Sequence, residues 1–339
     1  ATLGALREIW VLKSYRLENG NLLEFEGPID AESLHRAQWI DLCDATPEEK
    51  ALVEGALKID VSPVNDYEPF QVASHFSVSP HQMTMTGLLL TLRDENDPHL
   101  LKLTFIRARG VLVTISDGDP IGMSALIREC ESSFSHGSGP DDVLAGIFDM
   151  IVDHTDNILD KVGHDLDRIN TMVFQHHAST RRRLLLQASP RRRNRQLERV
   201  LSDLGPSREI LVKLRRSMLS FKRMTAFLRE QDTKGLIDKL DTFERDLRSI
   251  AEAETDLSTT AAFLLDAVVG YIGLLQNKVM NVLTLVGVIL TPPVLVASVY
   301  GMNFRHMPEL DWTYGYPFAL GLMAVATAAV YLFVRIRGL

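Results

Sequence analysis

The sequence predicts an α+β membrane protein with an N-terminal cytoplasmic α/β domain, a long helical stalk and two C-terminal transmembrane helices. Charged residues make up 24% of the 339 residues. None of them occurs from Val279 to Phe304 or from Thr313 to Val334. Each stretch exceeds the roughly 20 apolar residues that a helix needs to cross a bilayer. Short β-branched runs separated by turns fill the N-terminal part instead.

Residues 1–140 are expected to form the cytoplasmic α/β domain. Thr46 is suited to cap a helix, with Pro47 at the first helical position and Glu49 completing a capping box. The runs that predict strands are QWIDL (38–42), HFSVS (75–79), QMTMTGLLLTLR (82–93), HLLKLTFIRA (99–108) and VLVTIS (111–116). A mixed sheet covered by helices is the expected result.

Residues 141–276 are expected to form a cytoplasmic helical bundle and stalk. No proline interrupts Asp141 to Thr180, and a second helix is predicted on both sides of Pro206. From about Asp232 the pattern is nearly continuous helix until Pro292-Pro293, before Tyr300. At ~1.5 Å per residue this last helix approaches 100 Å, so it must project well outside a membrane.

The predicted spans are 277–303 and 317–335, joined by an outer loop at 304–316 and followed by a tail at 336–339. The chain is expected in the inner (plasma) membrane. Lys278, Arg335 and Arg337 flank the spans, so the positive-inside rule predicts that both termini lie in the cytoplasm. The opening residues contain no apolar run typical of a signal peptide. Cys43 and Cys130 are therefore expected to be buried thiols rather than a disulfide.

A polar stripe runs along the first span. Asn277, Thr284, Thr291 and Ser298 recur every seven residues, with Gly287 on the same side. Hydroxyls in membrane helices also bond to their own backbone, which is the alternative to a pore lining. Two spans cannot enclose a water-filled path, so a pore requires several copies around an axis. Neither span contains an acidic residue or a histidine, which favours passive flow over proton coupling.

The loop after the first span carries a recognisable motif. Tyr300-Gly301-Met302-Asn303-Phe304 is followed by MPEL (307–310), Trp312 and Gly315-Tyr316. This combination resembles the signature of the CorA family of magnesium and cobalt transporters. The resemblance implies a homopentamer whose first span lines the pore.

The resemblance also implies roles for single residues. Gly301, Met302 and Asn303 would meet the hydrated ion at the outer mouth. Asn277 matches a pore-lining asparagine near the cytoplasmic entrance, and Met280 matches an apolar residue that narrows the closed pore. Asp266 matches an acidic residue of the stalk. Thr291 departs from the family, where a bulky apolar side chain is usual, and Pro292-Pro293 doubles the expected proline, which leaves the position of the gate open.

The expected cargo is a divalent cation, Mg²⁺ with Co²⁺ and Ni²⁺ as further candidates, moved down its electrochemical gradient. A Zn²⁺ transporter of the related ZntB-like branch is an alternative, because sequence does not fix the ion and His306, Glu309 and Asp311 in the outer loop offer other ligands. A membrane-anchored metal sensor or scaffold that transports nothing is the alternative from another class. Catalytic motifs are absent from the sequence, so neither an enzyme nor a bound cofactor is expected.

Two charged segments remain. Asp149, Asp153, Asp156 and Asp160, followed by His164, share one helix face. This row, or Asp241, Glu244 and Asp246 on the stalk, is hypothesised to sense cytoplasmic metal; a solvated face paired with basic residues is the alternative. Seven arginines lie between Arg181 and Arg195, where contact with lipid headgroups or with the acidic row is expected. A net charge of −8 and the lack of an aromatic platform argue against nucleic acid.

Overall fold

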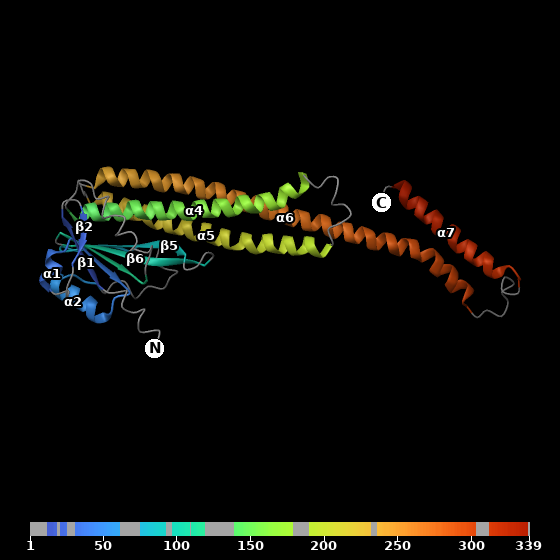
Figure 1. The fold of residues 1–339 in the computed structure, drawn as a ribbon, viewed down its shortest axis with the longest axis horizontal. Coiled ribbons are helices and arrows are strands. Elements are labelled where there is room, and N and C mark those ends of the chain that lie inside the picture. Colours follow the sequence, from blue (N-terminus) through green and yellow to red (C-terminus); the bar gives the residue numbers. More distant parts are fainter. Residues whose placement is uncertain are drawn as a thin grey trace. The chain divides into compact units, whose positions relative to one another are not determined.

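A computed structural model describes residues 12–18, 21–25, 31–61, 75–92, 97–108, 110–118, 139–178, 190–231, 236–302 and 312–337. The chain divides into two units, residues 1–265 and 266–339. The first holds a sheet and the helices that cover it, and the second holds the C-terminal helices (Figure 1). Helix α6 contributes to both units, so each unit is described separately.

The sheet of the first unit has seven strands in the order β2-β1-β3-β7-β6-β5-β4. Its pairs are antiparallel except for β3 with β7, which run parallel. The parallel pair joins the N-terminal strands to the later meander. The strands are β1 (Lys13–Glu18), β2 (Asn21–Glu24), β3 (Trp39–Cys43), β4 (His75–Val78), β5 (Met83–Leu92), β6 (Pro98–Ala108) and β7 (Val111–Ser116).

One face of the sheet is covered by α1 (Ala31–Arg36) and α2 (Pro47–Leu57). Leu34 and Val53 of these helices are buried in one apolar cluster with Ile40 and Val113 of the strands. The predicted capping box begins α2: the Thr46 hydroxyl accepts from the Glu49 amide, and the Glu49 carboxylate accepts from the Thr46 amide at 2.7 Å. The sequence prediction for this helix start is confirmed.

The other face of the sheet is covered by α4 (Pro140–Ala178) and α5 (Pro190–Glu230). Phe105 of β6 lies edge-on to Phe148 of α4, with ring centroids 5.8 Å apart. Gly87 of β5 lies so close to α5 that a Cβ there would sit 2.9 Å from the Met224 methyl group. These two helices therefore pack directly against the strands.

Helix α6 (Ile237–Tyr300) completes the helical layer in the first unit. Phe243 stacks on Phe148 with centroids 4.6 Å apart. Arg215 of α5 donates to the buried Glu254 carboxylate at 3.0 Å. Figure 1 shows α4, α5 and the first part of α6 side by side. The three long helices predicted from the sequence are confirmed.

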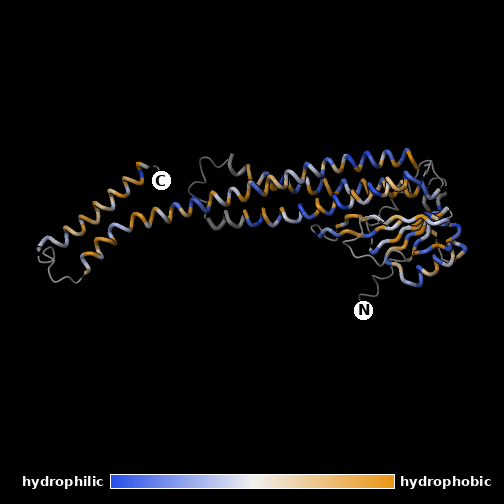
Figure 2. Tube along the Cα trace, turned by 180° about the vertical axis from the view of Figure 1, so that it is seen from behind, coloured by the Kyte–Doolittle hydropathy of each residue, from blue (hydrophilic) through white to orange (hydrophobic). Residues whose placement is uncertain are grey.

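The second unit contains the end of α6 and helix α7 (Gly315–Arg337). Both are long and apolar enough to cross a membrane, with peak mean hydropathies of 2.3 and 2.0. Figure 2 shows both helices coloured mainly as hydrophobic. The two predicted spans are confirmed as helices, while the limits at 140, 276 and 303 stay predictions.

The two prolines interrupt α6 less than expected. The nearly continuous helix was expected to be broken at Pro292-Pro293, inside the predicted span 277–303, but α6 runs through both prolines to Tyr300. Each proline removes one amide donor, yet a helix tolerates this in a membrane when neighbouring groups satisfy the freed carbonyls. The ribbon of α6 bends near its C-terminal end (Figure 1), as prolines inside helices cause.

The cysteine prediction is tested in part. Cys43 lies at the end of β3 and is buried, as expected. Cys130 lies outside the described residues. The Arg-rich segment also falls largely outside them: residues 179–189 are not described, and the side chains of Arg191 to Arg195 are not placed.

Candidate functional site

The polar stripe predicted on the first span forms an exposed face of α6. Asn277, Thr284, Thr291 and Ser298 are all exposed, and so are Met280 and Gly287. At about 100° per residue, these six positions lie within one side of the helix. The partly buried positions Leu285, Ile289, Pro292, Val296 and Tyr300 lie on the opposite side. The helix therefore separates an apolar, partly covered side from a side that carries polar groups and small residues.

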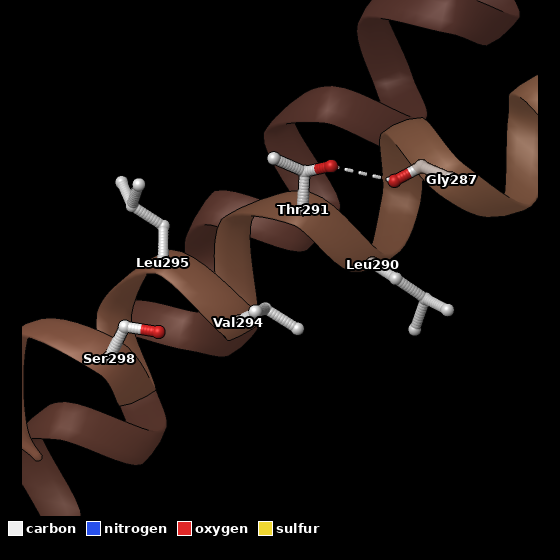
Figure 3. A pocket seen from close by; sticks show the side chains of 6 residues that line it. All are labelled: Gly287, Leu290, Thr291, Val294, Leu295 and Ser298. Carbon is white, nitrogen blue, oxygen red and sulfur yellow. Dashed lines mark hydrogen bonds between the residues drawn. The ribbon is translucent and has the colours of Figure 1, made fainter.

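A shallow hollow of about 310 Å³ lies on the stripe. It is lined by Gly287, Thr291 and Ser298 together with Leu290, Val294 and Leu295 (Figure 3). A Cβ added at Gly287 would meet no atom within 4 Å, so the glycine leaves open space at the helix surface. None of the three leucine and valine residues was predicted to be part of this site.

The hydroxyls of the stripe do not behave alike. The Thr291 hydroxyl donates to the Gly287 carbonyl at 2.8 Å. A hydrogen bond to the helix's own backbone is what the alternative to a pore lining predicts for this residue. Thr327 of α7 likewise donates to the Met323 carbonyl at 2.7 Å. Within the described part of the chain, the hydroxyls of Thr284 and Ser298 make no hydrogen bond. In hydrocarbon an unmade polar contact is costly, so these two hydroxyls need water or another chain.

The described part of the first span ends on Gly301 and Met302. The Gly301 amide donates to Ala297 at 2.9 Å, and the Met302 amide donates to Val299 at 3.2 Å, which closes the last turn of α6. A Cβ at Gly301 would lie 3.1 Å from the Ala297 carbonyl oxygen, a tight contact that explains a glycine here. Met302 is half exposed. Asn303, His306, Glu309 and Asp311 lie outside the described residues.

The acidic row on α4 is solvent-exposed. Asp149, Asp153, Asp156, Asp160 and His164 are all exposed on one face. Asp149 keeps an exposed surface, but the atoms packed around it remove part of its solvation and raise its pKa. The carboxylates of Asp153 and Asp246 raise this pKa further, and Lys239 opposes them. No group of three or more His, Cys, Asp or Glu side chains that could hold a metal ion occurs among the described residues.

The other proposed sensing residues lie in different surroundings. Asp241 and Glu244 of α6 both accept hydrogen bonds from Arg229 in the last turn of α5, Glu244 at 3.1 Å. These ion pairs link two helices of the same chain. Asp266 is exposed on α6. A metal role for any of these carboxylates stays a prediction.

The comparisons with known proteins agree with this architecture. The profile of the family described as CorA-like Mg²⁺ transporter protein matches residues 35–336. The chain belongs to this CorA family. It is 24% identical over 330 residues to the magnesium transport protein CorA of Mannheimia succiniciproducens, covering 97% of this chain and 99% of that protein. It is also 24% identical over 328 residues to the magnesium transport protein CorA of Escherichia coli K12, covering 96% and 98% of the two chains.

Solved structures share the fold along nearly the whole chain. The CorA magnesium transporter of Methanocaldococcus jannaschii superposes with a TM-score of 0.72 at 17% identity, covering 96% of this chain and 97% of that one. The full-length CmaX protein gives a TM-score of 0.64 at 15% identity, with coverage of 96% and 97%. The two apolar helices of the second unit are thus the membrane spans of a CorA-family fold.

Proposed function

We propose that this chain is one subunit of a homopentameric divalent-cation channel of the CorA type that conducts Mg²⁺ into the cell. The observation that carries the proposal is the exposed polar face of α6, which leads along the span to Gly301 and Met302. One chain supplies only one wall of a path, and several copies around an axis would enclose it. The free hydroxyls of Thr284 and Ser298 would then face a wet lumen.

The lining suits an ion that keeps its water. Mg²⁺ dehydrates reluctantly and usually retains several waters when bound. Amide and hydroxyl groups such as those of Asn277, Thr284 and Asn303 can hydrogen-bond to these waters without removing them. A ring of carboxylates would bind the ion more tightly and slow its release. The outer-mouth role of Gly301, Met302 and Asn303 is part of this proposal.

The membrane potential is a sufficient driving force. Moving a divalent cation inward gains about 4.6 kcal/mol per 100 mV, twice the figure for a single charge. The spans contain no carboxylate and no histidine that could carry a proton with each ion. We therefore propose uncoupled flow through the inner (plasma) membrane, with both chain termini in the cytoplasm and Lys278 and Arg335 at the cytoplasmic boundary.

Ion uptake into proteoliposomes tests the function. The purified protein is compared for uptake of Mg²⁺, Co²⁺, Ni²⁺ and Zn²⁺, with an imposed membrane potential and with or without a proton gradient. We expect potential-driven Mg²⁺ uptake that Asn303→Ala reduces to the level of empty liposomes. Thr327→Ala is the matched control, because Thr327 bonds to its own helix backbone on α7, and it should leave uptake unchanged.

Two other outcomes would replace this function. Zn²⁺ uptake that requires the proton gradient would assign the chain to zinc transport. An assembled oligomer that passes none of the four ions under any gradient would favour a metal sensor or scaffold. Both outcomes would leave the fold and the family membership intact.

A further inference from the structure

Two long helices of the first unit expose faces of opposite charge. The α4 face carries Asp153, Asp156 and Asp160, all exposed and without an ion pair within the described part of the chain. Their spacing of three and four residues places neighbouring Cβ atoms about 5–6 Å apart, and like charges at this spacing destabilise a helix. A partner that brings positive charge to this face would remove that cost.

The α5 face is basic and partly apolar. Arg208, Val212, Arg216 and Leu219 follow the three- and four-residue spacing of one helix side. Val212 is 48% exposed and Leu219 49% exposed. The opposite side of α5 is buried, with Leu211 and Leu214 in the core. Neither Arg208 nor Arg216 forms an ion pair with any described residue.

The two faces match in length as well as in charge. Asp153 and Asp160 are seven residues apart, and Arg208 and Arg216 are eight, which correspond to about 10.5 Å and 12 Å along a helix. Val212 and Leu219 give this face an apolar centre, and arginine is among the residue types enriched in protein interfaces. Neither face contacts the sheet of its own chain, because each lies on the side of its helix opposite the buried residues.

We infer that the acidic face of α4 docks on the basic face of α5 of a second copy of this chain. A ring of identical subunits needs two different, complementary patches on each subunit, and these two faces supply them. The inference rests on the ring assembly of the proposed function, but it goes further, since it names the cytoplasmic surfaces that join neighbouring subunits. Both faces lie in the first unit, so this contact is separate from any contact between membrane spans.

Charge reversal tests the inference on the full-length protein in detergent. Variant A is Asp153→Lys with Asp156→Lys and Asp160→Lys, and variant B is Arg208→Glu with Arg216→Glu. Each should raise the dissociated fraction, measured by native mass spectrometry, by about tenfold, because like charges would then face each other. In a chain that carries the substitutions of both variants, the α4 face is basic and the α5 face is acidic. Opposite charges face each other again, so we expect the dissociated fraction to return toward that of the wild type.

A matched control separates this effect from net charge. Lys50→Glu with Lys58→Glu changes the charge as much as variant B does, but at α2, on the other face of the sheet. It should leave assembly unchanged. The salt concentration gives a second check. Raising it from about 0.1 M to 1 M shortens the screening length from ~10 Å to ~3 Å. The dissociated fraction of the wild type should then rise, and the dissociated fractions of the variants should differ less from it.

Crosslinking covers the case in which the membrane spans alone hold the oligomer together. In a variant with Arg208→Lys and Arg216→Lys, a zero-length carboxyl-to-amine reagent should join α4 peptides to α5 peptides and give multimers on a denaturing gel. Adding Asp153→Asn, Asp156→Asn and Asp160→Asn should remove these crosslinks. Crosslinks that persist after this change, or that never involve α4 and α5, would overturn the inference.

The remaining outcomes also decide the question. A variant A that assembles normally but loses Mg²⁺ binding would show that the acidic face takes a cation instead. A variant B that assembles normally but loses binding to phosphatidylglycerol vesicles would show that the basic face takes lipid. A wild-type protein that is a monomer would end the channel proposal itself, whereas an intact oligomer insensitive to every reversal would end this inference alone.

Discussion

The two units of this chain bury their apolar residues in different ways. In the first unit, large side chains such as Trp39, Phe105, Phe148 and Phe243 are almost fully buried by residues of the same chain. In the second, Leu283, Leu295 and Val325 are each at least 65% exposed. From Asn277 onward, Ala319 is the only apolar side chain of the described residues that is buried. The first unit is stabilised by its own core, whereas the apolar side chains of the second are left largely uncovered by their own chain.

The sharpest test of this difference removes one large side chain from each unit. Phe148→Ala should cost about 3–5 kcal/mol, because Phe148 contacts Phe105, Phe221 and Phe243 in the middle of the helical layer. Leu283→Ala should change the free energy of unfolding by less than about 0.5 kcal/mol, since its side chain contacts little within the chain. Urea unfolding of both full-length variants in detergent gives the comparison, and equal losses would contradict it.

Two glycines give a smaller contrast between the units. Gly87→Ala places a Cβ 2.9 Å from Met224 and 3.3 Å from Ser220, so β5 and α5 must separate, at a cost of about 1–3 kcal/mol. Gly287→Ala meets nothing within 4 Å in its own chain. We expect Gly87→Ala to lower the unfolding temperature with ion flux per folded oligomer unchanged.

The second glycine should show the reverse behaviour. Gly287→Ala should leave the unfolding of the first unit unchanged and lower Mg²⁺ flux, because the added methyl group enters the hollow that would face the lumen. Gly321→Ala on α7 is the matched control, since a Cβ there also meets nothing. If Gly287→Ala and Gly321→Ala have the same flux, the hollow does not lie on the conduction path.

Substitutions at Thr291 test whether water fills the proposed pore at the middle of the first span. Thr291→Met replaces a hydroxyl in the hollow with a long apolar side chain, and apolar constrictions can close a pore by excluding water. We expect several-fold lower Mg²⁺ flux for Thr291→Met. Thr291→Ser retains a hydroxyl able to bond to the Gly287 carbonyl and should stay close to the wild type. Unchanged flux and gating in Thr291→Met would place the gate elsewhere.

The sequence predicted elements best where one local pattern decides the structure. The capping box at Thr46, the three long helices and the two uncharged spans all depend on neighbours within a few residues. Strands β1 and β2 were missed, because runs such as KSYRLE mix charged and apolar residues at the outer strands of the sheet. The parallel pairing of β3 with β7 joins residues about 73 positions apart, as in Asp41 with Thr114, and no local pattern encodes it.

The candidate site was predictable to a similar degree. The seven-residue period found the exposed face of α6, but Leu290, Val294 and Leu295 were not predicted to line the hollow, because an apolar residue in a membrane helix gives no signal of its own. Continuation of α6 through Pro292 and Pro293 was also missed, since local rules for proline describe helices in water. A membrane helix has no water with which to replace its hydrogen bonds, so it keeps its regular form where a soluble helix would end.

The smallest predicted effect concerns acid stability of the first unit. His154 of α4 forms a 3.1 Å hydrogen bond to the Leu90 carbonyl of β5. Burial lowers the pKa of His154, and this hydrogen bond only partly opposes the shift. The unfolded chain therefore binds the proton first as the pH falls below about 6.5, and stability drops from there down to the lowered pKa, by at most about 1.4 kcal/mol per pH unit. Above pH 6.5 this contribution is fully present.

A substitution that keeps the contact but cannot titrate isolates this effect. His154→Gln retains a donor for the Leu90 carbonyl, so unfolding free energies measured between pH 5 and 7.5 should lose part of their slope. His164→Gln, at an exposed position of the same helix, should keep the wild-type slope. A slope that survives in His154→Gln would mean that other groups of the first unit cause the acid sensitivity. The hydrogen bond between His154 and Leu90 would then link α4 to β5 without contributing to the pH dependence of stability.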